Sequence, residues 1–292
     1  MAGLALPLNV GGPAARPSAR REFSPLPGFR GAMAITLLYV GLIIILPIAA
    51  LTARPWEHGL EGVIHTLSQP RTLKALRLSF VAATVSALAN VVMGLIIAWV
   101  LTRYRFPGRR ILDALVDLPF ALPTAVAGIA LATLYGPNGW IGSLLAPLDV
   151  KIAYTPLGVY VALLAVGLPF VVRAVQPVLE DLDAAYEEAA HTLGANKLQI
   201  FLHVLLPSLA PALVTGFSMA FARGAGEYGS VIFIAGNMPG ISEIAPLVIV
   251  TRLEQYDYAG AATVGLAMLA ISLAVLMITN GAQLALSRRG AR

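Results

Sequence analysis

Residues 78–102 read LSFVAATVSALANVVMGLIIAWVLT and contain no charged side chain. A helix of this length can cross the hydrocarbon core of a bilayer, which is about 30 Å thick and needs roughly 20 residues. The whole chain has the same character, because 58% of its 292 residues are hydrophobic and 12% are charged, against about 25% charged in soluble domains. The run therefore predicts a membrane helix in a protein that crosses the membrane several times.

Five other runs of this kind flank residues 78–102, and the expected fold is an all-α membrane bundle. The six predicted transmembrane helices lie within Gly31–Ala53, Leu78–Thr102, Leu118–Leu148, Ile152–Val172, Leu198–Ala222 and Tyr258–Ser287. Together they predict one transmembrane domain over residues 31–287. Residues 228–242 and 244–251 are apolar but too short to cross, so a re-entrant or interfacial segment buried against protein is expected there.

The basic residues are distributed unevenly between the two sides of this bundle. Thirteen fall on one side, namely Arg16, Arg20, Arg21, Arg30, Arg103, Arg105, Arg109, Arg110, Arg173, Lys197, Arg288, Arg289 and Arg292. Seven fall on the other, namely Arg54, Arg71, Lys74, Arg77, Lys151, Arg223 and Arg252. The side richer in Lys and Arg is cytoplasmic as a rule. Both termini are then cytoplasmic, with a proline-rich disordered tail over residues 1–30 and a short tail over residues 288–292.

The sequence lacks the residue sets of most catalytic and metal sites. It has no cysteine, and its four histidines are not paired at metal-binding spacings. None of its three lysines lies in a P-loop, G-x4-G-K-[ST], so the chain is not expected to hydrolyse ATP. The predicted spans also lack the buried acids and histidines of a proton-coupled carrier. We expect no catalytic residue, metal or cofactor in this chain, and no nucleic-acid partner, because the basic excess of a membrane protein marks its cytoplasmic loops.

One cytoplasmic segment, residues 180–197, is acidic instead of basic. Apolar side chains recur in it every three or four residues beside an acidic face, which predicts a short amphipathic helix. Gly194 can adopt the left-handed conformation that ends such a helix, and Asn196 can cap the next one. A helix that binds anionic lipid would be rich in Lys and Arg, so a protein partner is expected for this segment.

The same segment carries a recognisable pattern, Glu188-Ala189-Ala190, then Gly194, Val204 and Leu206-Pro207. It resembles the EAA motif of permease subunits in bacterial ABC importers, E-A-A-x3-G-x9-I-x-L-P, with Val204 in place of isoleucine. In that family the loop forms a coupling helix that docks on the ATPase subunit. The resemblance implies a coupling loop over about residues 176–205, with ATPase contacts at Glu187, Glu188, Ala189, Ala190, Gly194, Leu206 and Pro207.

Further stretches are similar to the T-type permease subunit of sulfate/thiosulfate importers. They are LPFALPT at 118–124, YTPLG at 154–158, GLPFVVR at 167–173, QPVLE at 176–180 and GEYGSVIFIAGN at 226–237. This resemblance implies a multi-pass subunit of the bacterial cytoplasmic (inner) membrane that imports sulfate or thiosulfate by alternating access. It also implies the partners: a second, W-type permease, two copies of an ATPase that bind ATP and Mg, and a periplasmic or extracellular sulfate-binding protein.

Two features of the residues bear on a route for the substrate. Pro119 and Pro123 interrupt the third predicted span, where they either let its halves swing or are tolerated as ordinary kinks. Arg223 and Glu227 are spaced to pair on a helix, either to attract and restrain an anion or as a structural ion pair. The substrate-path candidates are Pro123, Thr124, Arg223, Glu227, Ser230 and Asn237.

Other polar and kinked positions have structural expectations. Asp113 and Asp117 near the cytoplasmic end of the third span are expected to be neutralised by Arg109 and Arg110. Pro47 and Pro169 are expected to kink the first and fourth spans.

Two alternative functions remain open at the level of sequence. The first keeps the class and changes the cargo to molybdate or tungstate, since tetrahedral oxyanions differ little in shape. The second is a stand-alone secondary carrier, in which the acidic loop would have no ATPase to bind.

Overall fold

The computed structural model describes residues 29–290, and every regular element in that range is a helix. This confirms the all-α prediction. The chain divides between Ala49 and Ala50 into two compact units, which are described separately. Residues 1–28 of the predicted N-terminal tail and residues 291–292 of the C-terminal tail lie outside the described range.

The first predicted span begins in α1 (Phe29–Val40) and continues through a π-helical segment, η1 (Gly41–Ile45), into α2 (Leu46–Ala53). Pro47 accounts for the π-helical segment η1, because proline donates no backbone hydrogen bond and its ring would clash with the carbonyl four residues earlier. A second π-helical segment, η4 (Phe201–Leu205), precedes Pro207 in the same way. The helices continue through both prolines.

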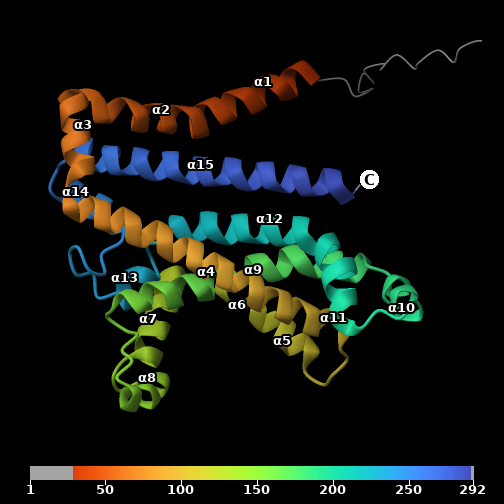
Figure 1. Cartoon of the computed structure of the whole chain (residues 1–292). Helices are drawn as coiled ribbons and strands as arrows, with labels where there is room; N and C mark the ends of the chain where they lie inside the picture. The colour runs from red at the N-terminus through yellow and green to blue at the C-terminus, as the bar shows by residue number, and fades with distance from the viewer. Residues whose placement is uncertain (1–28, 291–292) are drawn as a thin grey trace, which may run out of the picture. The chain divides into compact units, whose positions relative to one another are not determined.

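The second unit contains all the remaining helices (Figure 1). In chain order they are η2 (Arg54–His58), α3 (Gly59–Ser68), α4 (Pro70–Arg103), α5 (Arg109–Val116), α6 (Leu118–Ala121), α7 (Thr124–Tyr135), α8 (Trp140–Leu145), η3 (Ala146–Leu148), α9 (Pro156–Asp181), α10 (Ala184–Thr192), α11 (Lys197–Ile200), η4, α12 (Leu206–Ala225), α13 (Val231–Ile234), α14 (Ala245–Glu254) and α15 (Tyr258–Gly290). The last helix continues three residues into the predicted C-terminal tail.

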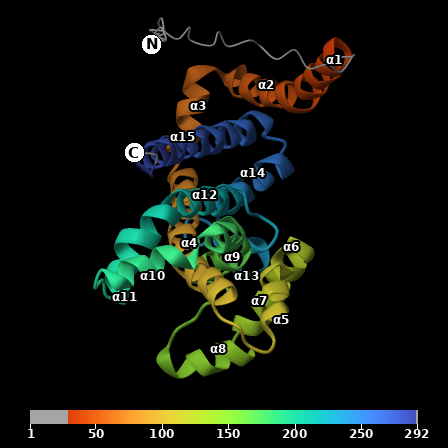
Figure 2. The ribbon, with the colours of Figure 1, turned by 90° about the vertical axis from the view of Figure 1, so that its right-hand side faces the viewer.

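The core of this unit is formed by α4, α9 and α12, and α9 lies between α4, α12 and α13 in Figure 2. Small or polar side chains recur every fourth residue along α4, and all are buried: Ser86, Asn90, Gly94 and Ala98. Small residues let membrane helices approach closely. A Cβ on Gly94 would lie 2.7 Å from Val171 of α9, and a Cβ on Gly216 of α12 would lie 2.9 Å from the Cα of the same valine. The three helices therefore meet around Val171.

Five stretches are long and apolar enough to cross a membrane: Gly31–Glu57, Pro70–Arg103, Pro156–Asp181, Lys197–Ala225 and Tyr258–Ala285. The third predicted span, Leu118–Leu148, is not one helix. It is divided among α6, α7, α8 and η3. Pro123 forces Leu122 into an extended conformation between α6 and α7, and Gly136 and Gly139 flank the turn between α7 and α8.

The segment between the fifth and sixth predicted spans contains only the short helices α13 and α14 and is packed against protein. The backbone N–H of Tyr154 donates to the carbonyl of Ile234 at 2.6 Å, and the N–H of Ala245 donates to Ser79 Oγ at 2.8 Å. Ile234, Ile244 and Ala245 are almost completely buried. The prediction of a buried segment too short to cross is confirmed.

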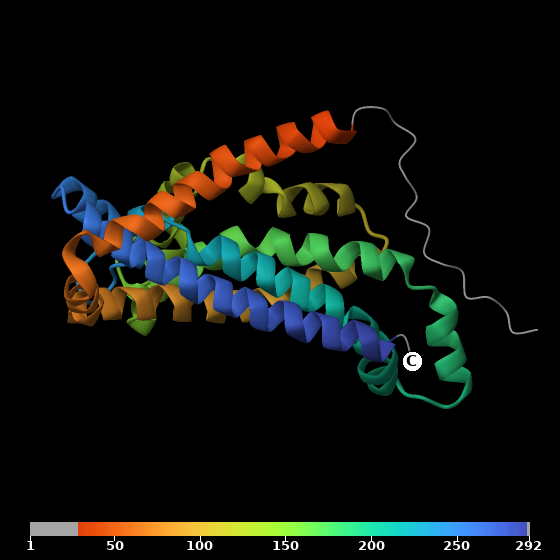
Figure 3. The same ribbon diagram turned by 90° about the horizontal axis from the view of Figure 1, so that it is seen from above.

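The helices of the second unit run in alternating directions, which sorts its loops between two ends (Figures 1 and 3). α4, α9 and α15 finish at the end where α10 and α11 lie. α3, α13 and α14 lie at the opposite end. The loop bearing the EAA motif is therefore far from the segment that carries Glu227 and Asn237.

Candidate functional site

The predicted coupling loop forms a helix with defined boundaries. Asp183 caps the N-terminus of α10, and its carboxylate accepts from the backbone N–H of Ala185 at 3.0 Å. The helix ends after Thr192, and Gly194 has φ of 87°. This is the left-handed conformation predicted from the sequence, which glycine adopts without the steric cost of a Cβ.

The chain then turns directly into the next helix. Asn196 and Gln199 form a capping box, in which each side chain accepts the other residue's backbone N–H at 2.9 Å. The predicted cap at Asn196 is thus present, and it satisfies backbone donors that a helix terminus leaves unpaired. From Lys197 the helix runs through η4 and the Leu206-Pro207 pair into α12. The loop is consequently fixed to a membrane-spanning helix at its downstream end.

Several side chains of the coupling loop are exposed to solvent in this chain. Tyr186, Glu188 and Ala189 are exposed on α10, and Leu193 just after it is 88% exposed. Exposed apolar side chains gathered on and beside a short helix are typical of a surface that another protein covers.

Glu187 differs from its neighbour Glu188. It is only partly exposed, and its Oε1 lies 2.9 Å from Arg103 Nη2 at the end of α4. The resemblance assigned both glutamates to the ATPase, but in this chain Glu187 already has an intramolecular partner. The sequence did not distinguish the paired Glu187 from the exposed Glu188, because the two acids are adjacent.

At the opposite end of the unit, the structure brings together four of the six substrate-path candidates. Glu227 is 3% exposed and forms an ion pair with Arg223. Its Oε1 also accepts hydrogen bonds from the backbone N–H and the hydroxyl of Ser230, both at 2.9 Å. A Cβ on Gly229 would lie 2.2 Å from Thr124 Oγ1, so the first residue of α7 packs directly on this turn.

The two other candidates play different parts. Pro123 is the N-cap of α7. Asn237 lies beyond α13 with φ of 54°, and its amide donates to the carbonyl of Ile232 at 2.6 Å. The hydrogen bond of the Asn237 side chain is therefore made within its own loop and not with the Arg223–Glu227 pair.

The partner of Asp113 and Asp117 is Arg173 of α9, not Arg109 or Arg110 as the sequence suggested. Arg173 lies 2.7 Å from Asp113 and 2.6 Å from Asp117, and its Nε donates to Asp117 Oδ1 at 2.8 Å. Arg109 and Arg110 are the first two residues of α5, whereas Asp113 in this helix and its C-cap Asp117, four residues apart, both lie toward α9. This network ties α5 to α9 beside the broken third span.

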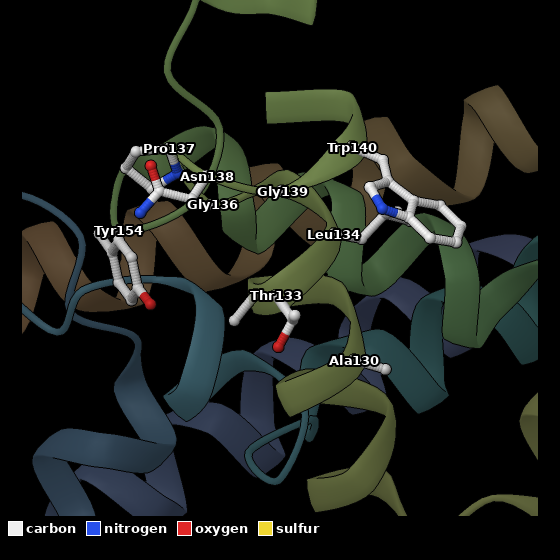
Figure 4. Close-up of a pocket in the computed structure, with 10 residues that line it drawn as sticks. Ala130, Thr133, Leu134, Gly136, Pro137, Asn138, Gly139, Trp140 and Tyr154 are labelled. Carbon is white, nitrogen blue, oxygen red and sulfur yellow. The ribbon is translucent and has the colours of Figure 1, made fainter. Parts of the chain in front are cut away.

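A pocket of about 640 Å³ lies at the turn from α7 to α8 (Figure 4). Its lining includes Thr133, Asn138, Trp140 and Tyr154, and none of the predicted site residues. In the described part of the chain, no three His, Asp or Glu residues are placed to hold a metal ion.

Comparison with known proteins gives the family. Residues 90–292 match the model of the family described as "binding-protein-dependent transport system inner membrane component". The "sulfate transport system permease protein CysT" of Salmonella typhimurium is 48% identical over 264 residues, which cover 90% of this chain and 95% of the relative. The protein of the same name in Escherichia coli is 47% identical with the same coverage. A "probable sulfate transport system permease protein cysT" of Nephroselmis olivacea is 50% identical over 86% of this chain and 89% of its own length.

Solved structures share the fold at low sequence identity. A bacterial ABC transporter that imports alginate superimposes with a TM-score of 0.73 at 14% identity, over 87% of this chain and 94% of that one. The MetNI methionine ABC transporter gives 0.56 at 18% identity, over 73% and 95%. The family model covers well over half of the chain, and the relatives match nearly all of it. The chain belongs to the family of binding-protein-dependent transport system inner membrane components.

Proposed function

We propose that this chain is the membrane-spanning, non-catalytic permease subunit of an ATP-driven importer that moves sulfate or thiosulfate into the cytoplasm by alternating access. The observation that carries this proposal is the identity of 47–50% to relatives named as sulfate transport permeases, over 86–90% of the chain.

The energy comes from a separate ATPase that docks on α10. Moving a dianion inward against the membrane potential costs about 2.3 kcal/mol per charge per 100 mV, and this chain has no P-loop. The exposed face of α10, the turn at Gly194 and the link from Leu206-Pro207 into α12 support a docking role. Two ATPase copies bind the ATP and Mg, and the permease residues act by contact alone.

The chain crosses the bacterial inner membrane six times, with both termini in the cytoplasm. The segment α5–α6–α7, residues 109–135, makes the third crossing as a broken helix, and the five long helices make the others. This orientation is supported by the distribution of basic residues along the sequence, with thirteen in the segments expected on the cytoplasmic side and seven in the others. An extended backbone at Leu122 is tolerated at membrane depth where protein buries it.

A second, W-type permease and a sulfate-binding protein complete the importer. Exposed apolar side chains follow one face of α4 and need cover from lipid or from the second permease: Val81, Val85, Leu88, Val92 and Ile96. One of the structural relatives was solved with an alginate pentasaccharide-bound periplasmic protein, which supports delivery of the substrate from outside.

Uptake of radiolabelled sulfate tests this function in cells that express the chain with its companion subunits and lack other sulfate importers. We expect uptake that requires the ATPase and is competed weakly by molybdate. Strong competition by molybdate would favour the alternative cargo. Uptake by the chain alone, without an ATPase, would favour the secondary carrier.

A further inference from the structure

The last turn of α4 contacts the segment in which α9 ends and α10 begins. Arg103 Nη2 lies 2.9 Å from Glu187 of α10 and donates to the backbone carbonyl of Leu182 at 3.3 Å. Leu182 is the C-cap of α9, directly after the last helical residue, Asp181. The side chains of Arg103 and Glu187 are 23% and 30% exposed, so their attraction is screened less than that of a surface pair.

The same turn of α4 also contacts the segment that follows α10 and leads into α12. The guanidinium carbon of Arg103 lies 5.8 Å from the centre of the Trp99 ring, within cation–π range. Trp99 in turn meets Phe201, the first residue of η4, edge to face at 6.3 Å. Trp99 and Arg103, here called the α4 bracket, therefore contact the coupling loop both before and after its turn at Gly194.

The α4 bracket adjoins the closely packed interface between α4 and α9. Ala98 and Leu101 of α4 are fully buried, as are Val175 and Leu179 of α9. Helices packed this closely move as one body, because their interiors leave little room for independent shifts. A force on α10 that reaches the bracket is consequently passed to α4 and α9 together.

The two adjacent acids of α10 differ in their surroundings. Glu188 is exposed and available to a partner, whereas Glu187 is held by Arg103. We propose that Arg103 is a positioning residue that ties the coupling helix to α4, so that movement imposed on α10 by the ATPase reaches the membrane helices. This inference rests on the proposed function and names the part of the chain through which coupling acts.

Matched substitutions test the coupling. We compare Arg103→Gln with Arg105→Gln, an exposed arginine for which the structure records no ion pair, in the full complex. We expect Arg103→Gln to retain the ATPase and to lower the sulfate moved per ATP hydrolysed about tenfold, within the range of allosteric couplings. Arg105→Gln keeps the wild-type ratio. Equal ratios in the two variants would overturn the proposal.

A charge exchange separates positioning from simple stability. Arg103→Glu and Glu187→Arg should each uncouple transport, and the double variant should recover most of the ratio because the pair is restored in reverse. If Arg103→Glu loses the ATPase and the double variant does not recover it, the pair is only structural and the inference is wrong.

A distance measurement tests the bracket independently of the substrate. The chain has no cysteine, so spin labels on the exposed residues Tyr104 and Tyr186 report one distance. We expect the same distance in the nucleotide-free and ATP-trapped complexes, and a broader distribution after Arg103→Gln. A shift of the wild-type distance between the two states would contradict the bracket. A constant distance in a complex that moves no sulfate would refute the proposed function and leave the bracket standing.

Discussion

Gly194 adopts φ of 87° in the turn after α10, and among residues 29–290, its chain neighbours apart, no heavy atom lies within 4 Å of the Cβ that another residue would add there. The requirement for glycine inside this chain is therefore one of backbone conformation, which costs about 1–2 kcal/mol for an ordinary L-residue. The open space at this position is where the proposed ATPase would lie.

Asparagine and aspartate at position 194 separate the contributions of shape and charge. Both tolerate the left-handed conformation better than other residues and differ only in charge. We expect Gly194→Asn to reduce sulfate uptake modestly. Gly194→Asp should uncouple the complex, with poor ATPase retention or ATP hydrolysis without transport, because it adds a further negative charge to an acidic surface. The test measures sulfate uptake and co-purification of the ATPase in the same preparations of each variant. Normal values for both in Gly194→Asp would remove this loop from the coupling role.

Glu227 is a buried carboxylate whose charge is balanced by Arg223 and by two hydrogen bonds from Ser230. Arg223→Gln leaves that charge unpaired, which costs about 3 kcal/mol for a buried group and less here because Arg223 is partly exposed. We expect a lower thermal unfolding temperature in detergent that the double variant Arg223→Gln/Glu227→Gln recovers. An anion-guiding role for Arg223 would appear separately, as a raised KM for sulfate that the double variant retains. If KM is unchanged in both, the pair is structural only.

Local chemistry explains which residues could be assigned from the sequence. The glycine turn, the Asn196 cap and the Arg223–Glu227 pair depend on residues at most four positions apart. Arg173 and Asp117 are 56 residues apart in the chain, and Arg103 reaches Glu187 through tertiary packing. Sequence spacing carries no information on such pairs, so the wrong arginines were assigned to Asp113 and Asp117.

At the scale of the helices, the prolines had different effects, and the closely spaced pair in the third predicted span had the largest. Pro169 lies inside an unbroken α9, which packs on both α4 and α12, and Pro47 follows a π-helical turn. Pro119 and Pro123 are four residues apart, so the donors they remove and the extended residue between them fall within one turn. The chain breaks there and the third span becomes α6 and α7. Helix existence was predictable, but the break depends on this combination and on packing.

The close approach of α4 and α9 gives a prediction for Gly94. An alanine there would place its Cβ 2.7 Å from Val171, and overpacking of this kind costs about 1–3 kcal/mol. We expect Gly94→Ala to lower the thermal unfolding temperature of the detergent-solubilised protein. Gly281→Ala in α15 is the matched control, because nothing lies within 4 Å of its Cβ position and alanine favours the helix. Equal stability of the two variants would mean that α4 and α9 do not pack as described.

At the scale of the whole molecule, the ends of the second unit should lie on opposite sides of the membrane. A cysteine at Glu61 in α3 is expected to react with a membrane-impermeant thiol reagent in intact cells, and a cysteine at Arg105 only after permeabilisation. Both residues are exposed, and the chain has no cysteine background. The reverse pattern in intact cells would invert the orientation and place α10 outside, away from any ATPase.

The central claim is that this permease moves sulfate only when an ATPase drives it through the coupling loop. The most direct test is the complete complex in proteoliposomes, with ATP hydrolysis and radiolabelled sulfate accumulation followed in the same sample. We predict accumulation only when ATP and the sulfate-binding protein are both present, and its loss in Gly194→Asp although the complex remains in the membrane. Accumulation of sulfate without ATP, or at the wild-type rate in Gly194→Asp, would contradict the account.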